Sequence, residues 1–223
     1  MIALTDAFAL FGIAVALCAG ALTLSLCRFG RRNSFEQPSG LQGWVKAGLL
    51  ALFIALLVPM PGAGIALAGF FRGFMGDLSI TLLALSIWSL CHRLFGTAAI
   101  VQRELSALLV VVGTSALLLY PTALGWGDWD AYRLGWGSWW LFSALLAISG
   151  FSVWMGLRVL PVLIALALLG WRVGLMESGN LWDYLLDPWL SAFALGYVVV
   201  GFIKCSQIVY RRFDNSANNR SPH

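Results

Sequence analysis

The chain has 223 residues, of which 60% are hydrophobic and 11% are charged, and its mean hydropathy is +0.85. Soluble domains are about 45–50% apolar, so this composition excludes an ordinary water-soluble globular protein. The net charge of +4 does not indicate nucleic-acid binding, because the basic residues are scattered between apolar segments instead of being gathered on one face.

Seven apolar segments approach the length of about 17 to 25 residues with which a helix crosses the hydrocarbon core of a membrane. We therefore predict an all-α fold, a polytopic transmembrane helical bundle of about seven spans. Residues 1–213 form its single transmembrane domain, and 214–223 form a short disordered cytoplasmic tail. The predicted spans are residues 7–27, 44–60 (with an extension to 71), 78–95, 105–120, 139–157, 159–176 and 188–203.

The distribution of basic residues predicts the orientation of these spans. When the connections are assigned alternately to two sides, eleven Lys and Arg residues fall on one side and three on the other. Positive charge concentrates on the cytoplasmic side, so the N-terminus lies outside and the C-terminus inside. The first span is followed by its arginines, which favours an uncleaved span over a signal peptide. We expect an integral protein of the plasma membrane, the inner membrane of a bacterial envelope.

The predicted outer loop between the fourth and fifth spans contains Leu-Gly-Trp-Gly twice, starting at residues 124 and 134. Glycine allows tight turns and close backbone approach, and indole rings favour the headgroup level, so an aromatic belt is the simplest interpretation. Alternatively, the aromatic rings stack on a sugar or lipid headgroup and the carboxylates bind its hydroxyls. The candidate binding residues of this loop are Trp126, Asp128, Trp129, Asp130, Tyr132 and Arg133.

The last outer loop, residues 177–189, repeats the acidic and aromatic composition. Asn180 is placed to cap a short helical turn, and Asp187 followed by Pro188 is typical of an N-cap and first helical residue. Asp183 and Asp187 would share a face if the segment were continuously helical. With the acids of the other loop they would then offer oxygen ligands to Ca²⁺ or Mg²⁺, but no motif of defined spacing is present. We predict no metal and no cofactor, and we keep both aspartates as candidate binding residues.

The second span is followed by a Pro-Gly-rich interruption at residues 59–64. It is either a re-entrant piece lining a cavity, as in transporters with broken helices, or a turn at the membrane surface that closes an ordinary span. Asp77 is expected to cap the third span, and Arg72 is a candidate partner for Asp77 or for another outer carboxylate. Both belong to the candidate binding residues.

The sequence lacks the Walker, GxSxG and HExxH motifs, and its two histidines, His92 and His223, lie apart. We therefore favour a non-catalytic accessory protein or subunit whose outer face docks a membrane protein or the headgroup of a lipid-linked glycan. A carrier or flippase with a broken second span is the first alternative. The second is an enzyme that acts on a lipid-linked substrate, with Asp128, Asp130 and Asp183 as acid or base.

Overall fold

The structure is a computed structural model that describes residues 4–30, 43–62 and 64–218. These parts of the chain are all-helical and contain no strand. The predicted all-α class is therefore confirmed. The elements are α1 (Leu4–Gly30), α2 (Gly43–Leu57), α3 (Leu67–Met75), α4 (Ile80–Phe95), α5 (Gln102–Ala123), the 3₁₀ helix η1 (Ala131–Gly135), α6 (Trp139–Trp154), α7 (Val159–Val173), α8 (Leu181–Leu185) and α9 (Pro188–Asn218).

Each of the seven predicted spans contains one long helix. By length and composition, Leu4–Leu24 of α1 and Gln102–Ala123, which is α5, are able to cross a membrane. The other five are shorter apolar helices: α2, α4, α6, α7 and the Pro188–Ile203 part of α9. The described residues thus indicate membrane association, with two helices of spanning length and five shorter ones. Helix α9 runs on to Asn218, beyond residue 213 where the predicted domain ends.

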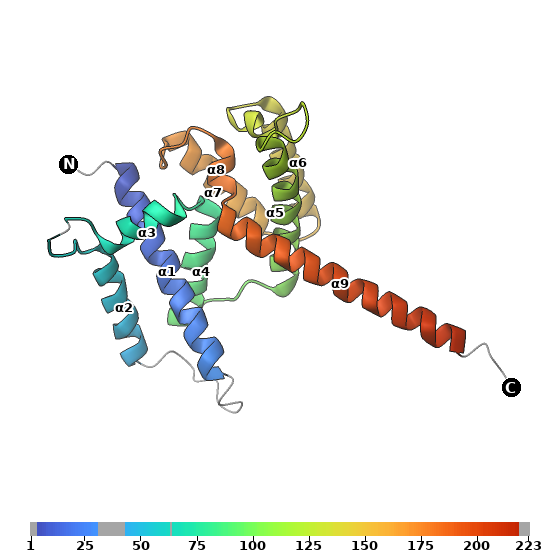
Figure 1. Cartoon of the computed structure of the whole chain (residues 1–223), viewed down its shortest axis with the longest axis horizontal. Helices are drawn as coiled ribbons and strands as arrows, with labels where there is room; N and C mark the ends of the chain where they lie inside the picture. The colour runs from blue at the N-terminus through green and yellow to red at the C-terminus, as the bar shows by residue number, and fades with distance from the viewer. Residues whose placement is uncertain (1–3, 31–42, 63, 219–223) are drawn as a thin grey trace.

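The long helices are arranged as neighbours in a bundle. Helix α1 packs on α2 and α4, α4 packs on α7, α7 packs on α6, and α5 packs on α9. Figure 1 shows the short elements α3, η1 and α8 gathered at one end of the bundle, while α9 leaves it obliquely toward the C-terminus. We call the end of the bundle that carries α3, η1 and α8 the α8 end. The α4–α5 and α6–α7 connections lie at the opposite end.

Local signals in the sequence set where several of these helices begin and end. The hydroxyl of Ser79 caps α4 by accepting from the Leu82 backbone N–H at 3.1 Å. The helix ends at Gly96, whose φ of +69° is the left-handed conformation that glycine adopts at little cost. Asp77 was predicted to cap this helix, and that prediction is wrong. Ser79 takes the cap because it directly precedes the first helical residue.

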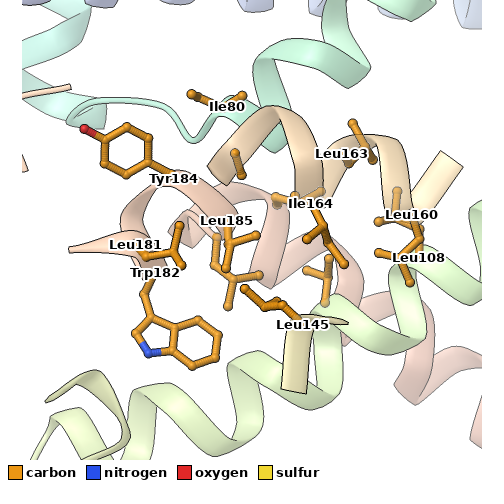
Figure 2. Packing of buried hydrophobic residues seen from close by; sticks show 14 of the residues in the cluster. Ile80, Leu108, Leu145, Leu160, Leu163, Ile164, Leu181, Trp182, Tyr184 and Leu185 are labelled. Atoms are coloured by element: carbon orange, nitrogen blue, oxygen red, sulfur yellow. The ribbon is translucent and has the colours of Figure 1, made fainter. Parts of the chain in front are cut away.

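The apolar core lies in two parts. One joins α1, α2, α3 and the start of α4 around residues such as Ile13 and Leu56. The larger part contains residues from all the elements from α4 through α9. Figure 2 shows residues of α8 in this cluster with residues of α6 and α7: Leu181, Trp182 and Leu185 with Leu145 and Ile164. The short helix α8 is therefore part of the core and fixes the loop that carries it.

The outward faces of the helices are also apolar. In α6, Trp139 is 82% exposed, Leu146 is 75% exposed and Trp154 is 81% exposed. Soluble monomers rarely expose large contiguous apolar areas, because water does not solvate them favourably. These faces agree with the membrane association indicated by the helices themselves.

The segment after α2 is a compact turn. Helix α2 ends at Leu57 and does not extend toward residue 71. Pro59 and Ala66 form an antiparallel bridge, and the Met60 N–H donates to the Ile65 carbonyl at 3.0 Å. Most of the turn is exposed, and α3 then crosses the α8 end as a separate helix. Two backbone N–H groups of the turn, those of Met60 and Gly64, thus have carbonyl acceptors within it.

Candidate functional site

The predicted outer residues meet at the α8 end, where Arg72 binds three carboxylates from three parts of the chain. Its guanidinium lies 2.7 Å from Asp6 of α1, 2.7 Å from Asp77 before α4 and 2.9 Å from Glu177 after α7. A second bond of 3.3 Å makes the contact with Asp77 bidentate. The hydrogen bond that Arg72 donates to Asp77 is the main reason that the pKa of Arg72 lies above its ordinary value. The predicted pairing of Arg72 with an outer carboxylate is therefore present.

A buried carboxylate joins the beginnings of α4 and α9. Asp187 is 3% exposed, and its Oδ2 accepts a hydrogen bond of 2.6 Å from the Ser79 hydroxyl, which is fully buried. Its Oδ1 accepts from the Leu190 backbone N–H at 2.8 Å, so Asp187 is the N-cap of α9, as predicted. Because Ser79 caps α4 and Asp187 caps α9, one carboxylate links the N-terminal ends of two helices.

The two predicted outer loops are interlocked through hydrogen bonds. The Tyr132 hydroxyl donates to Asp183 Oδ2 at 2.9 Å, and the Asn180 side-chain amide donates to the Tyr132 carbonyl at 3.0 Å. The Trp182 indole N–H donates to the Ala131 carbonyl at 3.0 Å. Asn180 also caps α8, as predicted. These bonds hold η1 against α8, so the loop before α6 is fixed at its base.

The closest contact between the loops depends on a glycine. A Cβ atom on Gly135 would lie 1.7 Å from the Asn180 Oδ1 and 2.7 Å from the Trp182 ring, so no larger residue fits. In the first copy of the sequence repeat, Gly125 and Gly127 have φ of +87° and +100° and form turns instead. In the second copy Gly137 also has a positive φ, of +90°, so both copies bend the chain at their last glycine. The first glycine differs between the copies, because Gly125 forms a turn and Gly135 permits close approach.

The pKa of Tyr132 reflects its position in this contact. Partial burial raises the pKa of Tyr132 to about 12, and the hydrogen bond and negative charge of Asp183 act in the same direction. The Ser178 hydroxyl also hydrogen-bonds Asp183. The half-buried carboxylate of Asp183 thus accepts hydrogen bonds from two hydroxyl groups.

Four of the predicted loop residues are exposed instead. Trp126 is 75% exposed and Trp129 is 52% exposed. The exposed side chains of Asp128 and Arg133 make no hydrogen bond or ion pair within the described residues. Asp130 differs from Asp128, because its side chain accepts from the Tyr132 N–H at 2.9 Å and caps η1. The loop thus has a hydrogen-bonded base and an exposed, aromatic tip.

No known family matches this chain. Comparison with family models, with curated proteins and with solved structures gave no match in any of the three. The function is therefore argued from the arrangement of its own residues.

The condition for a metal site is not met in the described part of the chain. Helix α8 ends at Leu185 and Leu186 is extended, so Asp183 and Asp187 do not share a helical face. Each binds different partners, and no group of three or more His, Cys, Asp or Glu side chains is close enough among the described residues to hold an ion.

Some residues that build the α8 end were not predicted as site residues. Asp6, Glu177 and Ser178 take part in its ion pairs and hydrogen bonds. Ser79 had a local signal, because a serine directly before an apolar run is a preferred N-cap. Asp6 and Glu177 had none, since they lie 66 and 105 residues from Arg72 in the sequence.

Proposed function

We propose that this protein is a non-catalytic integral membrane subunit whose α8 end docks a partner protein on the extracytoplasmic side. The observation that carries the proposal is a loop with an exposed aromatic tip on a fixed base. The side chains of Trp126 and Trp129 are exposed, and the hydrogen bond between Asn180 and Tyr132 anchors the base of the loop. Tryptophan and arginine are the residues that most often dominate binding energy at protein interfaces.

The fixed base matters for affinity. Ordering a mobile loop on binding costs free energy, and a loop held in advance avoids that cost. The close contact at Gly135 and the bonds from Asn180 and Trp182 restrain the chain next to the exposed rings. Asp128 and Arg133 supply one charge of each sign for a complementary partner.

The proposal includes an orientation: seven helices span the membrane, and the α8 end lies on the extracytoplasmic side. Support comes from the positive-inside distribution and from the apolar outer faces of the helices. Trp139 and Trp154 lie at opposite ends of α6, about 22 Å apart at 1.5 Å per residue, as two interfacial belts would require. Helices of this length are shorter than a core of about 30 Å, so we expect local thinning of the bilayer around them.

The contacts of the carboxylates favour docking over catalysis. Asp77, Asp130, Asp183 and Asp187 each hold a structural hydrogen bond or ion pair. Within the described residues, Asp128 is the one predicted acid whose side chain has no partner, and an acid and base pair needs two such groups near one reacting atom. The turn after α2 is mostly exposed and is closed by its own backbone hydrogen bonds, which favours a surface turn over the broken helix of a carrier.

The test is native mass spectrometry of the full chain, gently extracted from its own membrane. We expect a partner chain at fixed stoichiometry with the wild type, and at least a tenfold loss of it with Trp126→Ala combined with Trp129→Ala. Trp154→Ala is the matched control, since Trp154 is equally exposed at the other end of α6. A lone chain that carries a lipid or glycolipid would instead favour the carrier or the enzyme.

The orientation has a separate test in a variant without native cysteines. Asp128→Cys should react with a membrane-impermeant thiol reagent in intact cells, and Gln102→Cys should react only after the membrane is opened. Both residues are exposed, at the α8 end and the opposite end respectively. The reverse pattern would overturn the proposed orientation.

A further inference from the structure

An apolar groove runs between α4 and α7 near the opposite end of the bundle. It has a volume of about 540 Å³ and includes Ile87, Trp88 and Cys91 of α4 and Val162 and Leu166 of α7 in its walls. Ile87, Val162 and Leu166 are 40–49% exposed, so the groove opens through the side of the bundle. A groove of this composition, open in that direction, suits a hydrocarbon chain better than a polar ligand.

The inner end of the groove is held in a fixed shape. The Trp88 indole N–H donates to the Ala98 carbonyl at 3.0 Å, and His92 hydrogen-bonds the Thr97 carbonyl. Thr97 and Ala98 also line the groove. The connection after α4 therefore closes the groove at this end. A partner helix, about 10 Å across, would need a continuous face to pack along, and this wall interrupts it.

A cation stands at the same end. Arg158 is the residue before α7, and it lies one turn before Val162 and two before Leu166 on the same stripe of the helix. Its side chain is exposed and makes no hydrogen bond or ion pair within the described residues. The carboxylate of Glu104 accepts a hydrogen bond of 2.7 Å from the Val159 backbone N–H in this turn.

We propose that this groove binds one phospholipid of the cytoplasmic leaflet, with an acyl chain along Val162 and Leu166 and the headgroup phosphate on Arg158. The charge complementarity between an unpaired arginine and a phosphate selects an anionic lipid over a partner helix. The assignment to the cytoplasmic leaflet rests on the proposed orientation. The groove and its arginine do not depend on partner docking at the α8 end.

The experiment is native mass spectrometry of the full chain in detergent, titrated with phosphatidylglycerol or with phosphatidylcholine of the same acyl chains. We expect one phosphatidylglycerol to be retained per chain, and at least tenfold less retention in Arg158→Gln. Arg172→Gln is the matched control, because it removes an exposed arginine from the other end of α7. Ala98→Leu should also reduce retention, since Ala98 is exposed and its larger side chain narrows the groove without entering the core.

Retention at the wild-type level in both Arg158→Gln and Ala98→Leu would overturn the proposal, because it would show only unspecific lipid around the bundle. Equal retention of the two lipids by the wild type would overturn the role of the charge. A failure of docking at the tryptophans leaves these results unchanged, so the two proposals fail separately. A reversed thiol pattern would move the site to the other leaflet and overturn only that assignment.

Discussion

Replacement of Asp187 tests whether its buried carboxylate holds the beginnings of α4 and α9 together. In Asp187→Ala, α9 loses an N-cap worth about 1 kcal/mol. Ser79 loses a charged hydrogen-bond acceptor worth about 1.5–3 kcal/mol, and its hydroxyl is fully buried and out of contact with solvent. We therefore expect the free energy of unfolding to fall by about 3 kcal/mol.

Asp187→Asn separates the two contributions. The amide oxygen still accepts from the Leu190 N–H, so the cap is kept. The amide nitrogen cannot accept a hydrogen bond from the Ser79 hydroxyl, so the second contribution is lost. We expect the free energy of unfolding to fall by about 2 kcal/mol. If the two side chains interact as described, Ser79→Ala combined with Asp187→Asn should cost less than the sum of the single changes.

The assay is denaturant unfolding in detergent micelles, followed by the loss of helical circular dichroism. Asp128→Asn is the control, because this side chain is exposed and has no contact within the described residues, and we expect a change within about 0.5 kcal/mol. The reasoning is refuted if Asp187→Ala unfolds like Asp128→Asn. It is also refuted if Asp187→Asn is as unstable as Asp187→Ala, since the cap would then contribute nothing.

Three further predictions concern the α8 end. Tyr132 titrates at about 12 instead of its ordinary 10.0, so its contribution to stability is complete below pH 10.0 and is lost as the pH rises to about 12. When tyrosinate absorbance is followed against pH, Tyr132→Phe should lack a titration step near pH 12 that the wild type has. If the step that Tyr132→Phe lacks lies near pH 10.0 instead, the burial of Tyr132 is contradicted. Gly135→Ala places a Cβ against the Asn180 side chain and should lower the melting temperature far more than Gly125→Ser, whose site is open although its φ is positive; equal effects would contradict the close contact. Arg72→Gln leaves three carboxylates without their cation and should cost about 1–2 kcal/mol, less at high salt, as measured by the same unfolding assay; a cost independent of salt would argue against an electrostatic role.

Local patterns in the sequence were sufficient for several features. The apolar segments predict the seven long helices, because burial in lipid or protein requires runs of apolar residues whatever their neighbours are. Asn180 and Asp187 were predicted as caps, since a cap binds backbone only two or three residues away. The pairing of Arg72 with Asp77 was also within reach, at five residues' separation.

Other features were decided by the tertiary structure alone. The sequence indicated Asp128, Asp130 and Asp183 as equal candidates. Among the described residues only Asp128 lacks a side-chain partner, because Asp130 caps η1 and Asp183 binds Tyr132, which lies 51 residues away in the sequence. Ser79 and Asp187 form a pair across 108 residues, and nothing in their local spacing indicates it. Short-range order is encoded in neighbouring residues, whereas the partner of a buried polar group is chosen by how the helices pack around it.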